Sequence, residues 1–517
     1  MSLSTTIICS LVAICIFSIT RYTKLRHFPG PRWTAISDWP HSLAMLSGNC
    51  HKWYADVSEK YGPIARVAPR ILITSSPEVW MHVNTKPGYK RSDWYYNAAR
   101  IEYQRDNVFS QTDNAKHEAR RKQMAPGYSG RENLDLEKSV DERLSELLHL
   151  IRSKYLSSTC IVPMDLAKKV QYFTLDVISS VGLGKTFGML QSDTDTDNYL
   201  QSSEEGLAIG NTALALGFSW IAQAPILGRF IAPSPSDNNG FGKMMASAFR
   251  VVDERAASFF STSANKEKSD MLASFMRHAL SGDELRSEAL EQIIAGSDTT
   301  AAAIRGTLLH VITNPRVYGK LQREIDDTVA RGDAPASILN TSTTGTGLIT
   351  AAQAAKLPYL QAVIRESTRV LTPVSNIFAR DVPKDGDTVV VDGENVFIPG
   401  GDGVCIGYSA YAMHRSEQIY GQDAQAFRPE RWLESYPDPT KYARMIRTND
   451  LVFGHGHFRC LGRPVAQIEL GKTVFELLRN FDIALMDPTH PWDVRNHLGL
   501  FAISNMWVHV MERANRD

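Results

Sequence analysis

Hydrophobic residues recur every three or four positions through much of the chain, which is the spacing of an amphipathic helix. From about residue 114 to 330 this pattern is nearly continuous, and it returns on the C-terminal side. The segments with the clearest helical spacing are 140–156, 291–315, 357–370 and 464–480. The pattern predicts a mainly α-helical body.

Two short regions instead carry β-branched and apolar runs bounded by turn residues. Residues 65–75 contain the runs ARVA and ILITS, and residues 386–400 contain two apolar runs separated by Asp392-Gly393. An Asp-Gly step between two such runs is a strong hairpin signal. We therefore expect small β-sheets beside the helices. No linker divides the body, so 35–517 is predicted to be one large domain.

The first twenty residues differ in kind from the rest. Residues 3–20 contain no charged side chain, and a helix of this length spans roughly 27 Å, close to the thickness of the hydrocarbon core of a bilayer. A cleaved signal peptide carries its positive charges before the apolar segment, whereas here they follow it. The sequence predicts a membrane anchor over 1–20 and a charged, proline-rich hinge over 21–34. A signal peptide or an interfacial helix is the alternative.

Charge and cysteine content narrow the class of protein. Lysine plus arginine and aspartate plus glutamate both number 56, and this balance gives no support for a nucleic-acid binder, which usually carries a basic excess. The six cysteines are widely scattered. They do not form a disulfide framework, so a reducing compartment is favoured.

The segment FGHGHFRCLGRP, residues 453–464, is the densest group of chemically active residues. A zinc site could use His455, His457 and Cys460, but no CxxC or HxxxH partner completes a tetrahedron. A phosphate loop would need a Gly-Lys-Ser/Thr ending, which is absent. Cys460 precedes a predicted helix, whose N-terminal amides and dipole lower the pKa of a thiol and favour a metal-ligating thiolate. A structural loop cysteine remains the alternative.

Three further segments supply context for this cysteine. The run 291–315 places Gly296 and the poor helix formers Asp298, Thr299 and Thr300 inside a helical pattern. The other two segments are the helix 357–370, with Glu366 and Arg369 on one face, and the proline-broken FRPERW at 427–432. Taken singly, these segments also fit a helix kink, a surface ion pair and a loop.

Together and in this order, the segments resemble the cytochrome P450 superfamily of haem-thiolate monooxygenases over nearly the whole chain. The cysteine-loop signature is matched by Phe453, Gly456, Cys460 and Gly462, and the oxygen-groove motif by AGSDTT. The other two motifs are matched by Glu366 with Arg369 and by Pro429-Glu430-Arg431. The resemblance implies a haem held between a long distal helix and a proximal cysteine loop. It is closest to fungal microsomal members of secondary metabolism.

By this resemblance, Cys460 is the axial thiolate ligand of the iron of haem b, and Phe453 packs on the proximal haem face. Gly456 and Gly462 let the backbone pass close to the porphyrin and the sulfur. On the distal side, Gly296 leaves room for dioxygen, Thr299 hydrogen-bonds the oxygen during its activation, and Asp298 relays protons.

The resemblance also assigns the residues that surround the haem edge. The propionates are expected to be bound by His117, Arg121 and Arg380. At position 458, where the family usually has a propionate-binding Arg or His, this chain has Phe458, and His457 or Arg459 could substitute. Glu366, Arg369 and Arg431 are expected to form a structural charge network.

The expected partners follow from the same resemblance. Electrons come from NADPH through a membrane-bound cytochrome P450 reductase, with cytochrome b5 as a further donor, and the basic run 120–122 is a candidate docking site. The substrate is expected to be a hydrophobic terpenoid, polyketide or alkaloid, and the enzyme to lie in the endoplasmic reticulum membrane facing the cytosol. The substrate pocket is expected to be formed by 92–111, 207–225, 294–295, 373–378 and 499–502.

Two other functions remain open at this point. An oxygen-independent isomerase or dehydratase of the same fold is one, although such relatives often lose the groove threonine that is present here as Thr299. A zinc-stabilised, membrane-tethered interaction protein is the other.

Overall fold

The computed structural model describes residues 24–103, 105–259, 269–335, 347–434 and 438–513. The predicted anchor, 1–20, and the first residues of the hinge lie outside the described residues. Within the described part of the chain, no helix is long and apolar enough to cross a membrane.

Helices form most of the described structure, as the hydrophobic spacing predicts. The principal helices are α2 (Trp39–Leu46), α3 (Cys50–Tyr61), α4 (Pro77–Thr85), α5 (Asp93–Ala99), α6 (Asn114–Tyr128), α7 (Leu136–Leu150), α8 (Leu166–Leu183), α10 (Tyr199–Ala215), α11 (Gly228–Ile231), α12 (Gly240–Phe259), α14 (Met271–Arg277), α15 (Gly282–Ile312), α16 (Pro315–Ala330), α18 (Pro358–Val370), α21 (Pro439–Asp450) and α22 (Arg463–Asn480). The short helices used below are η1 (Arg32–Ala35), η4 (Ser219–Gln223), η6 (Pro429–Trp432), η7 (Leu451–Phe453) and η8 (Gly456–Phe458).

Four small sheets accompany the helices in the described residues. The largest has the order β1-β2-β8-β5-β3, the next β4-β12-β9, and the two others are the pairs β6-β7 and β10-β11. The strands are β1 (Ile64–Ala68), β2 (Ile71–Thr74), β3 (Lys90–Arg91), β4 (Met164–Asp165), β5 (Arg380–Asp381), β6 (Asp387–Val391), β7 (Glu394–Ile398), β8 (Cys405–Tyr408), β9 (Phe481–Leu485), β10 (Asp493–His497), β11 (Leu500–Ser504) and β12 (Trp507–Glu512).

Both predicted hairpins are present. β1 pairs antiparallel with β2, and β6 pairs antiparallel with β7. Between β6 and β7, Asp392 and Gly393 have φ of 50° and 86°, which are the positive values that a tight two-residue hairpin turn requires. The Asp-Gly signal therefore identified this turn correctly.

The end of the chain differs from the helical expectation. After α22, the described residues form the four strands β9 to β12. In β9 the buried residues alternate as Phe481 and Ile483, and in β12 as Val508 and Val510. A period of two is the spacing of a half-buried strand, so the sequence carried this signal.

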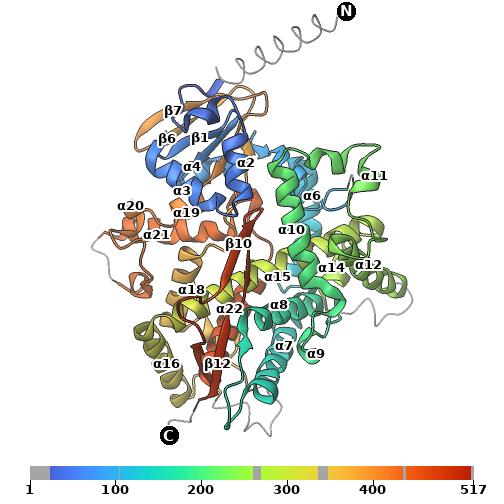
Figure 1. The fold of residues 1–517 in the computed structure, drawn as a ribbon, viewed down its shortest axis with the longest axis vertical. Coiled ribbons are helices and arrows are strands. Elements are labelled where there is room, and N and C mark those ends of the chain that lie inside the picture. The colour runs from blue at the N-terminus through green and yellow to red at the C-terminus, as the bar shows by residue number, and fades with distance from the viewer. Residues whose placement is uncertain (1–23, 104, 260–268, 336–346, 435–437, 514–517) are drawn as a thin grey trace, which may run out of the picture.

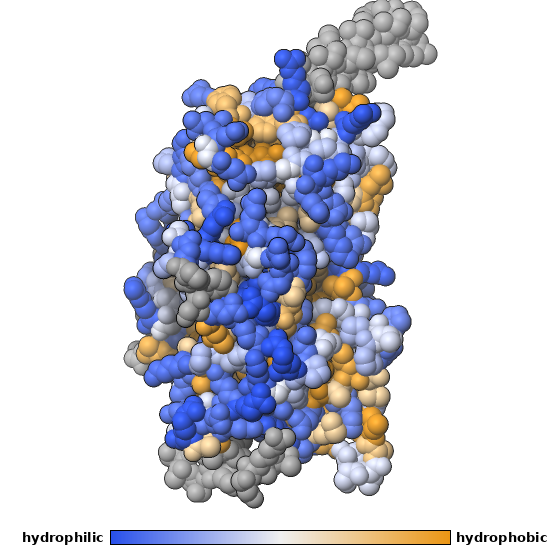
Figure 2. Space-filling view, turned by 90° about the vertical axis from the view of Figure 1, so that its left-hand side faces the viewer, coloured by the Kyte–Doolittle hydropathy of each residue, from blue (hydrophilic) through white to orange (hydrophobic). Residues whose placement is uncertain are grey.

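The long helix α15 crosses the centre of the molecule, between the sheet that contains β1 and the lower helices α7, α8 and α16 (Figure 1). Its largest interface is with α8, and the two helices share the main hydrophobic core with α7 and α22. Ile304 and Leu308 of α15 and Phe173 of α8 are completely buried there. This packing holds α15 in place, and α15 forms one wall of the cavity described below. Seen from the side, hydrophilic residues dominate the surface and hydrophobic residues form smaller patches (Figure 2).

Candidate active site

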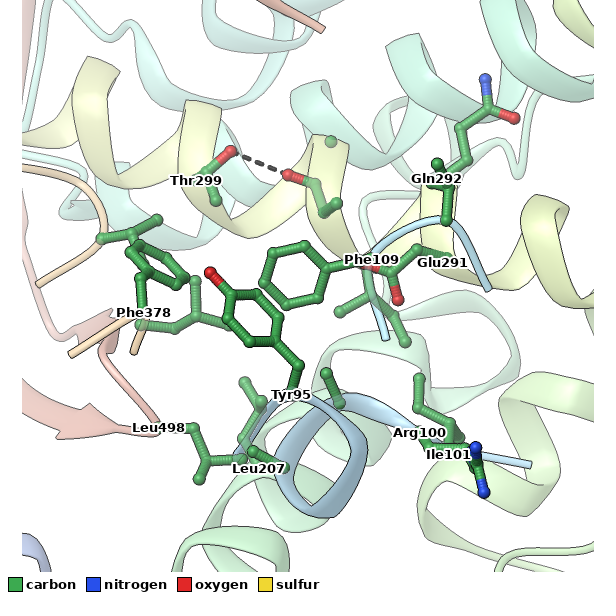
Figure 3. Close-up of a pocket in the computed structure, with 18 of the residues that line it drawn as sticks. Tyr95, Arg100, Ile101, Phe109, Leu207, Glu291, Gln292, Thr299, Phe378 and Leu498 are labelled. Carbon is green, nitrogen blue, oxygen red and sulfur yellow. Dashed lines mark hydrogen bonds between the residues drawn. The ribbon is translucent and has the colours of Figure 1, made fainter. Parts of the chain in front are cut away.

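A cavity of about 940 Å³ lies between α15 and the loop that contains Cys460. All five segments that the sequence predicts for the substrate pocket contribute to its lining. Apolar and aromatic side chains dominate the wall near α5 and α10, including Tyr95, Ile101, Phe109, Leu207 and Leu498 (Figure 3). A cavity of this size and lining is typical of a site for a hydrophobic small molecule.

Cys460 is presented to this cavity by a short irregular loop. The loop runs from η7 through η8 to the start of α22, and the Cys460 amide donates a hydrogen bond to the Phe453 carbonyl at 2.8 Å. This bond closes the loop without using the sulfur. The thiol of Cys460 is accessible and lines the cavity. Phe453 lines the same cavity and has the guanidinium of Arg463 at 5.2 Å from its ring.

The pKa of the Cys460 thiol differs from the sequence-based expectation. Burial within the protein raises the pKa, although the amides of Gly462 and Arg463 and the charge of Arg121 act in the opposite direction. The accessible surface of the sulfur faces the enclosed cavity rather than bulk water, which reconciles its accessibility with its burial. The helix N-terminus therefore favours a thiolate, but it does not by itself outweigh desolvation. A positive metal ion bound to the sulfur would supply the missing stabilisation.

The glycines of the site allow close contacts within the protein that the sequence did not predict. Gly456 has φ of 58°, and a Cβ there would lie 2.3 Å from the carbonyl oxygen of Asn84, at the end of α4. Gly296 lines the cavity, but a Cβ on it would meet Ile178 of α8 at 2.7 Å. The structure thus gives Gly296 a role in helix packing, and the expected role of making room for dioxygen stays a prediction. Of these three glycines, Gly462 lies beside the sulfur, since a Cβ on Gly462 would be 3.8 Å from Cys460 Sγ.

We expect Gly456→Ala to destabilise the protein by about 2 kcal/mol or more, because the new Cβ meets a backbone carbonyl and the positive φ costs an alanine about 1–2 kcal/mol. The measurement is the free energy of unfolding of the haem-loaded protein. Gly462→Ala is the matched control, since its Cβ makes an ordinary contact and its φ is −77°. Equal losses for the two variants would contradict the assignment of Gly456 to the contact with α4.

Thr299 and Asp298 lie on different sides of α15. Thr299 lines the cavity, and its hydroxyl donates to the Ala295 carbonyl at 2.8 Å, as the dashed line in Figure 3 shows. Asp298 is not among the residues that line the cavity. Its two carboxylate oxygens accept hydrogen bonds from Gln171 of α8 at 2.6 Å and from Ser203 of α10 at 2.9 Å. Burial raises the pKa of this carboxyl group. The structure therefore places Thr299, but not Asp298, in a position to contact a ligand directly.

Three arginines and one histidine gather at one edge of the cavity around Phe458. The guanidinium carbons of Arg380 and Arg91 lie 4.2 Å and 5.0 Å from the centre of the Phe458 ring, and the His117 ring lies 5.3 Å from it. Arg121, one helical turn after His117 on α6, lines the same cavity. Phe458 thus forms an aromatic platform for cations, at the position where the family usually has a cation of its own.

This basic cluster has no counter-ion of its own. Within the described residues, no carboxylate forms an ion pair with Arg91, Arg121 or Arg380, and the buried Nε atoms of Arg91 and Arg380 have no hydrogen-bond partner there. Burial, together with the neighbouring Arg380 and Arg121, lowers the pKa of Arg91 to about 10. Burial and the three arginines lower the pKa of His117 to about 3, so its ring is neutral. Buried charges without partners call for an anionic ligand.

Arg91 is a site residue that sequence reasoning missed, and Tyr95 was predicted only as part of the pocket segment 92–111. Arg380 donates to the Tyr95 hydroxyl at 2.5 Å and to the Phe378 carbonyl at 2.6 Å. Arg91 donates to the Val108 carbonyl at 2.6 Å. The sequence signal for Arg91 was weak: it is one of two adjacent basic residues, Lys90 and Arg91, just before the pocket segment 92–111. Its place depends on the pairing of β3 with β5, which joins Arg91 to Arg380.

Glu366, Arg369 and Arg431 form the predicted network, and all three side chains are fully buried. Glu366 accepts hydrogen bonds from Arg369 at 2.8 and 2.9 Å, from Arg431 at 2.9 Å and from the Trp432 indole at 3.0 Å. The network joins α18 to η6 and lies outside the residues that line the cavity. Its place in the structure fits the expected structural role.

The three residues of the basic run 120–122 do not all face solvent. Arg120 pairs with Glu284 at 2.8 Å and with Glu288 at 2.7 Å, and Arg121 faces the cavity. Only Lys122 is exposed, at 76% of its side chain. The zinc alternative also lacks support, because the described residues contain no group of three His, Cys, Asp or Glu side chains that could hold a metal ion.

The side chains at the cavity fit a haem group. Cys460 offers one sulfur ligand, the cluster of Arg91, Arg121, Arg380 and His117 offers donors for two propionates, and the apolar lining suits a porphyrin ring. The fit rests on guanidinium groups that form no ion pair with a carboxylate among the described residues, and which an anionic edge would neutralise. If haem binds here, Cys460 would be the residue that holds the iron.

Comparison with known proteins agrees with this fit. Residues 29–506 match the family model for cytochrome P450. The chain is 37% identical over 506 residues to cytochrome P450 monooxygenase ABA1 of Pyricularia oryzae, covering 96% of this chain and 94% of the relative. It is 36% identical to cytochrome P450 monooxygenase aba1 of Botryotinia fuckeliana, covering 94% and 92%. It is 28% identical to pisatin demethylase of Fusarium vanettenii, covering 91% and 86%. This chain belongs to the cytochrome P450 family of haem-thiolate monooxygenases.

Proposed function

We propose that this protein inserts one oxygen atom from dioxygen into a hydrophobic small molecule of fungal secondary metabolism, a terpenoid, polyketide or alkaloid. The single observation that carries the proposal is the cavity shared by the Cys460 sulfur, the Thr299 hydroxyl and three arginines without counter-ions. Bound haem supplies the activation of dioxygen, so that one oxygen atom enters the substrate and the other leaves as water with two electrons from NADPH. The protein itself supplies the sulfur ligand of the iron, a hydroxyl group that can exchange protons, and a pocket that excludes water.

The side chains divide these tasks by position. Cys460 holds the iron through its sulfur, and the basic cluster holds the anionic edge of the group. The apolar wall formed by α5, α10 and α15 orients the substrate and excludes water. Thr299 presents a hydroxyl that can accept and donate a proton beside the ligand, while Asp298 ties α15 to α8 and α10 and so positions that hydroxyl.

Thr299→Ala is expected to retain haem and substrate binding but to lower the yield of product per NADPH roughly 100-fold, with the electrons recovered as hydrogen peroxide. A positioned proton donor contributes about 10²–10⁴-fold in enzymes, and alanine removes it without changing the backbone. The measurement compares NADPH consumed, peroxide formed and product formed. Thr299→Ser, which keeps a hydroxyl, is the control. Unchanged coupling in Thr299→Ala would contradict this role.

We further propose that the protein lies in the endoplasmic reticulum membrane, held by the anchor predicted for 1–20 with the catalytic domain facing the cytosol. Large exposed apolar side chains in η1 and α2, and in the segment from η4 to α11, support a membrane contact of the domain. Asn211 of α10, the helix that precedes η4, donates to the Met45 carbonyl of α2 at 3.1 Å, so α2 lies against the helix that leads into the second segment. The exposed residues are Trp33, Trp39, Leu43, Phe218, Trp220, Ile226 and Phe230.

The proposed electron donor is NADPH-cytochrome P450 reductase, with cytochrome b5 as a second donor. Lys122 and Arg459 are exposed basic residues near the cysteine loop, and they suit an acidic flavoprotein surface.

The proposed function is tested with ¹⁸O₂. The purified protein, the reductase and NADPH are incubated with a panel of terpenoids, polyketides and alkaloids under ¹⁸O₂, and products are analysed by mass spectrometry. The expected result is a product that gains one ¹⁸O atom and depends on NADPH. A product of unchanged mass that forms without oxygen would instead establish the isomerase alternative.

A further inference from the structure

Three acidic residues line the cavity, Asp237, Glu291 and Glu469, and none of them has been given a role above. Glu291 lies on α15, and Glu291, Ala295 and Thr299 all line the cavity at four-residue steps along the helix. Figure 3 shows the Glu291 side chain beside Phe109, whereas the neighbouring Gln292 points away. Since eight residues separate Glu291 from Thr299, the two positions are roughly 12 Å apart along the helix axis.

The hydrogen bonds of Glu291 leave part of its carboxyl group unused. Asn107 donates from Nδ2 to one oxygen of Glu291 at 3.0 Å, and the structure shows no second partner for this carboxyl among the described residues. Asn107 is itself held rigidly, because its Oδ1 accepts from the amides of Phe109 and Ser110 at 2.9 Å and 2.7 Å. Glu291 and Asn107 therefore form a fixed polar pair on a largely apolar wall.

A purely structural role for Glu291 is already filled by its neighbour Glu288, one turn earlier. Glu288 is fully buried and uses both oxygens: one accepts from the Val108 amide in the loop after α5 at 3.1 Å, and the other accepts from Arg120 of α6 at 2.7 Å. Glu291 adds only one further bond to this loop. A buried polar group with spare hydrogen-bonding capacity is costly unless a ligand completes it.

The charge state of Glu291 indicates which ligand group it suits. Burial, and then the neighbouring Glu288, raise the pKa of Glu291 to about 8, while Arg91 and the Asn107 hydrogen bond act in the opposite direction. At neutral pH the group is mainly a neutral carboxylic acid, which can both donate and accept a hydrogen bond. Such a group suits a hydroxyl or carbonyl oxygen better than a cation.

We infer that Glu291 and Asn107 are specificity-determining residues that bind a hydroxyl or carbonyl oxygen of an otherwise apolar substrate, at the end remote from the carbon placed near Thr299. This inference rests on the proposed function for where the reacting carbon lies. The binding contact itself does not depend on turnover. The substrate class is thereby narrowed to a hydrophobic molecule that already carries an oxygen function.

The test measures binding of matched rigid probes to the full-length, haem-loaded protein without NADPH. The probes are 5α-androstane, 5α-androstan-3β-ol and the corresponding 3-trimethylammonium compound, delivered from one cyclodextrin carrier, with tryptophan fluorescence as the readout. We expect the wild type to bind the alcohol more tightly than the hydrocarbon. Glu291→Leu should reduce this preference about five- to tenfold, and Glu291→Gln, which retains hydrogen bonding, should largely preserve it.

Ile294→Val is the matched control on the same helix, since it trims the apolar wall and should weaken both uncharged probes by the same factor. An unchanged preference for the alcohol in Glu291→Leu would overturn the inference. A preference for the trimethylammonium probe that Glu291→Gln abolishes would also overturn it, because the group would then bind cations as a carboxylate. Since no turnover is involved, either result leaves the proposed oxygen insertion to be judged by the ¹⁸O₂ experiment.

Discussion

Replacing Cys460 with serine is expected to abolish NADPH-dependent oxygen insertion, lowering it by roughly a thousandfold or more, equivalent to about 4 kcal/mol in the activation barrier. A thiolate donates electron density to the iron and favours cleavage of the O–O bond, which a serine hydroxyl does not do. The loop itself should persist, because its closing hydrogen bond joins the Cys460 amide to the Phe453 carbonyl and does not involve the sulfur.

The measurement combines product formation with the amount of folded protein. Cys160→Ser is the control, since Cys160 is an exposed free cysteine far from the cavity lining and its replacement should leave activity unchanged. If Cys460→Ser folds, binds haem and still inserts oxygen at the wild-type rate, the sulfur is not the functional ligand.

Glu366→Gln is expected to destabilise the folded protein by about 3–5 kcal/mol, the usual cost of removing one partner from a buried ion pair. The wild-type carboxylate compensates two fully buried guanidinium groups, those of Arg369 and Arg431. A glutamine amide provides no negative charge. Its NH₂ group would also face the N–H groups of the two guanidinium groups, to which it cannot form hydrogen bonds. Arg369 would then lose the one carboxylate that pairs with it among the described residues, while Arg431 would keep Asp423 at 3.0 Å.

Urea unfolding followed by tryptophan fluorescence measures this loss, because Trp432 donates directly to Glu366 at 3.0 Å and reports on the network. Glu254→Gln is the matched control. Glu254 and its partner Arg250 are both 59% exposed and 4.0 Å apart, so this pair should contribute only about 0.2–0.5 kcal/mol. A loss in Glu366→Gln no larger than that of the control would show that the network does not stabilise the fold.

The sequence predicts those features that depend on local spacing. The helical period of 357–370 placed Glu366 and Arg369 on one face, where they pair. The glycine-rich segment before a helix placed Cys460 in a loop at the start of α22. The Asp392-Gly393 step identified the β6-β7 turn. In each case, neighbouring residues determine the geometry.

Features that depend on tertiary packing were not predictable in this way. Asp298 and Thr299 are adjacent in sequence, yet α15 turns the first toward α8 and α10 and the second toward the cavity. Gly296 serves the contact with Ile178 because α8 packs closely on α15. The basic edge of the site depends on Arg91, which the pairing of β3 with β5 brings beside Arg380. These relations join residues far apart in the chain.

The central claim is that Cys460 holds a haem iron through its sulfur, and the absorption spectrum of the reduced protein under carbon monoxide tests it most directly. The full-length protein is purified with haem, reduced, and exposed to carbon monoxide. The account predicts the strongly red-shifted Soret band that thiolate ligation produces. A protein that binds no haem, or a band at the position given by a neutral nitrogen ligand, would contradict it.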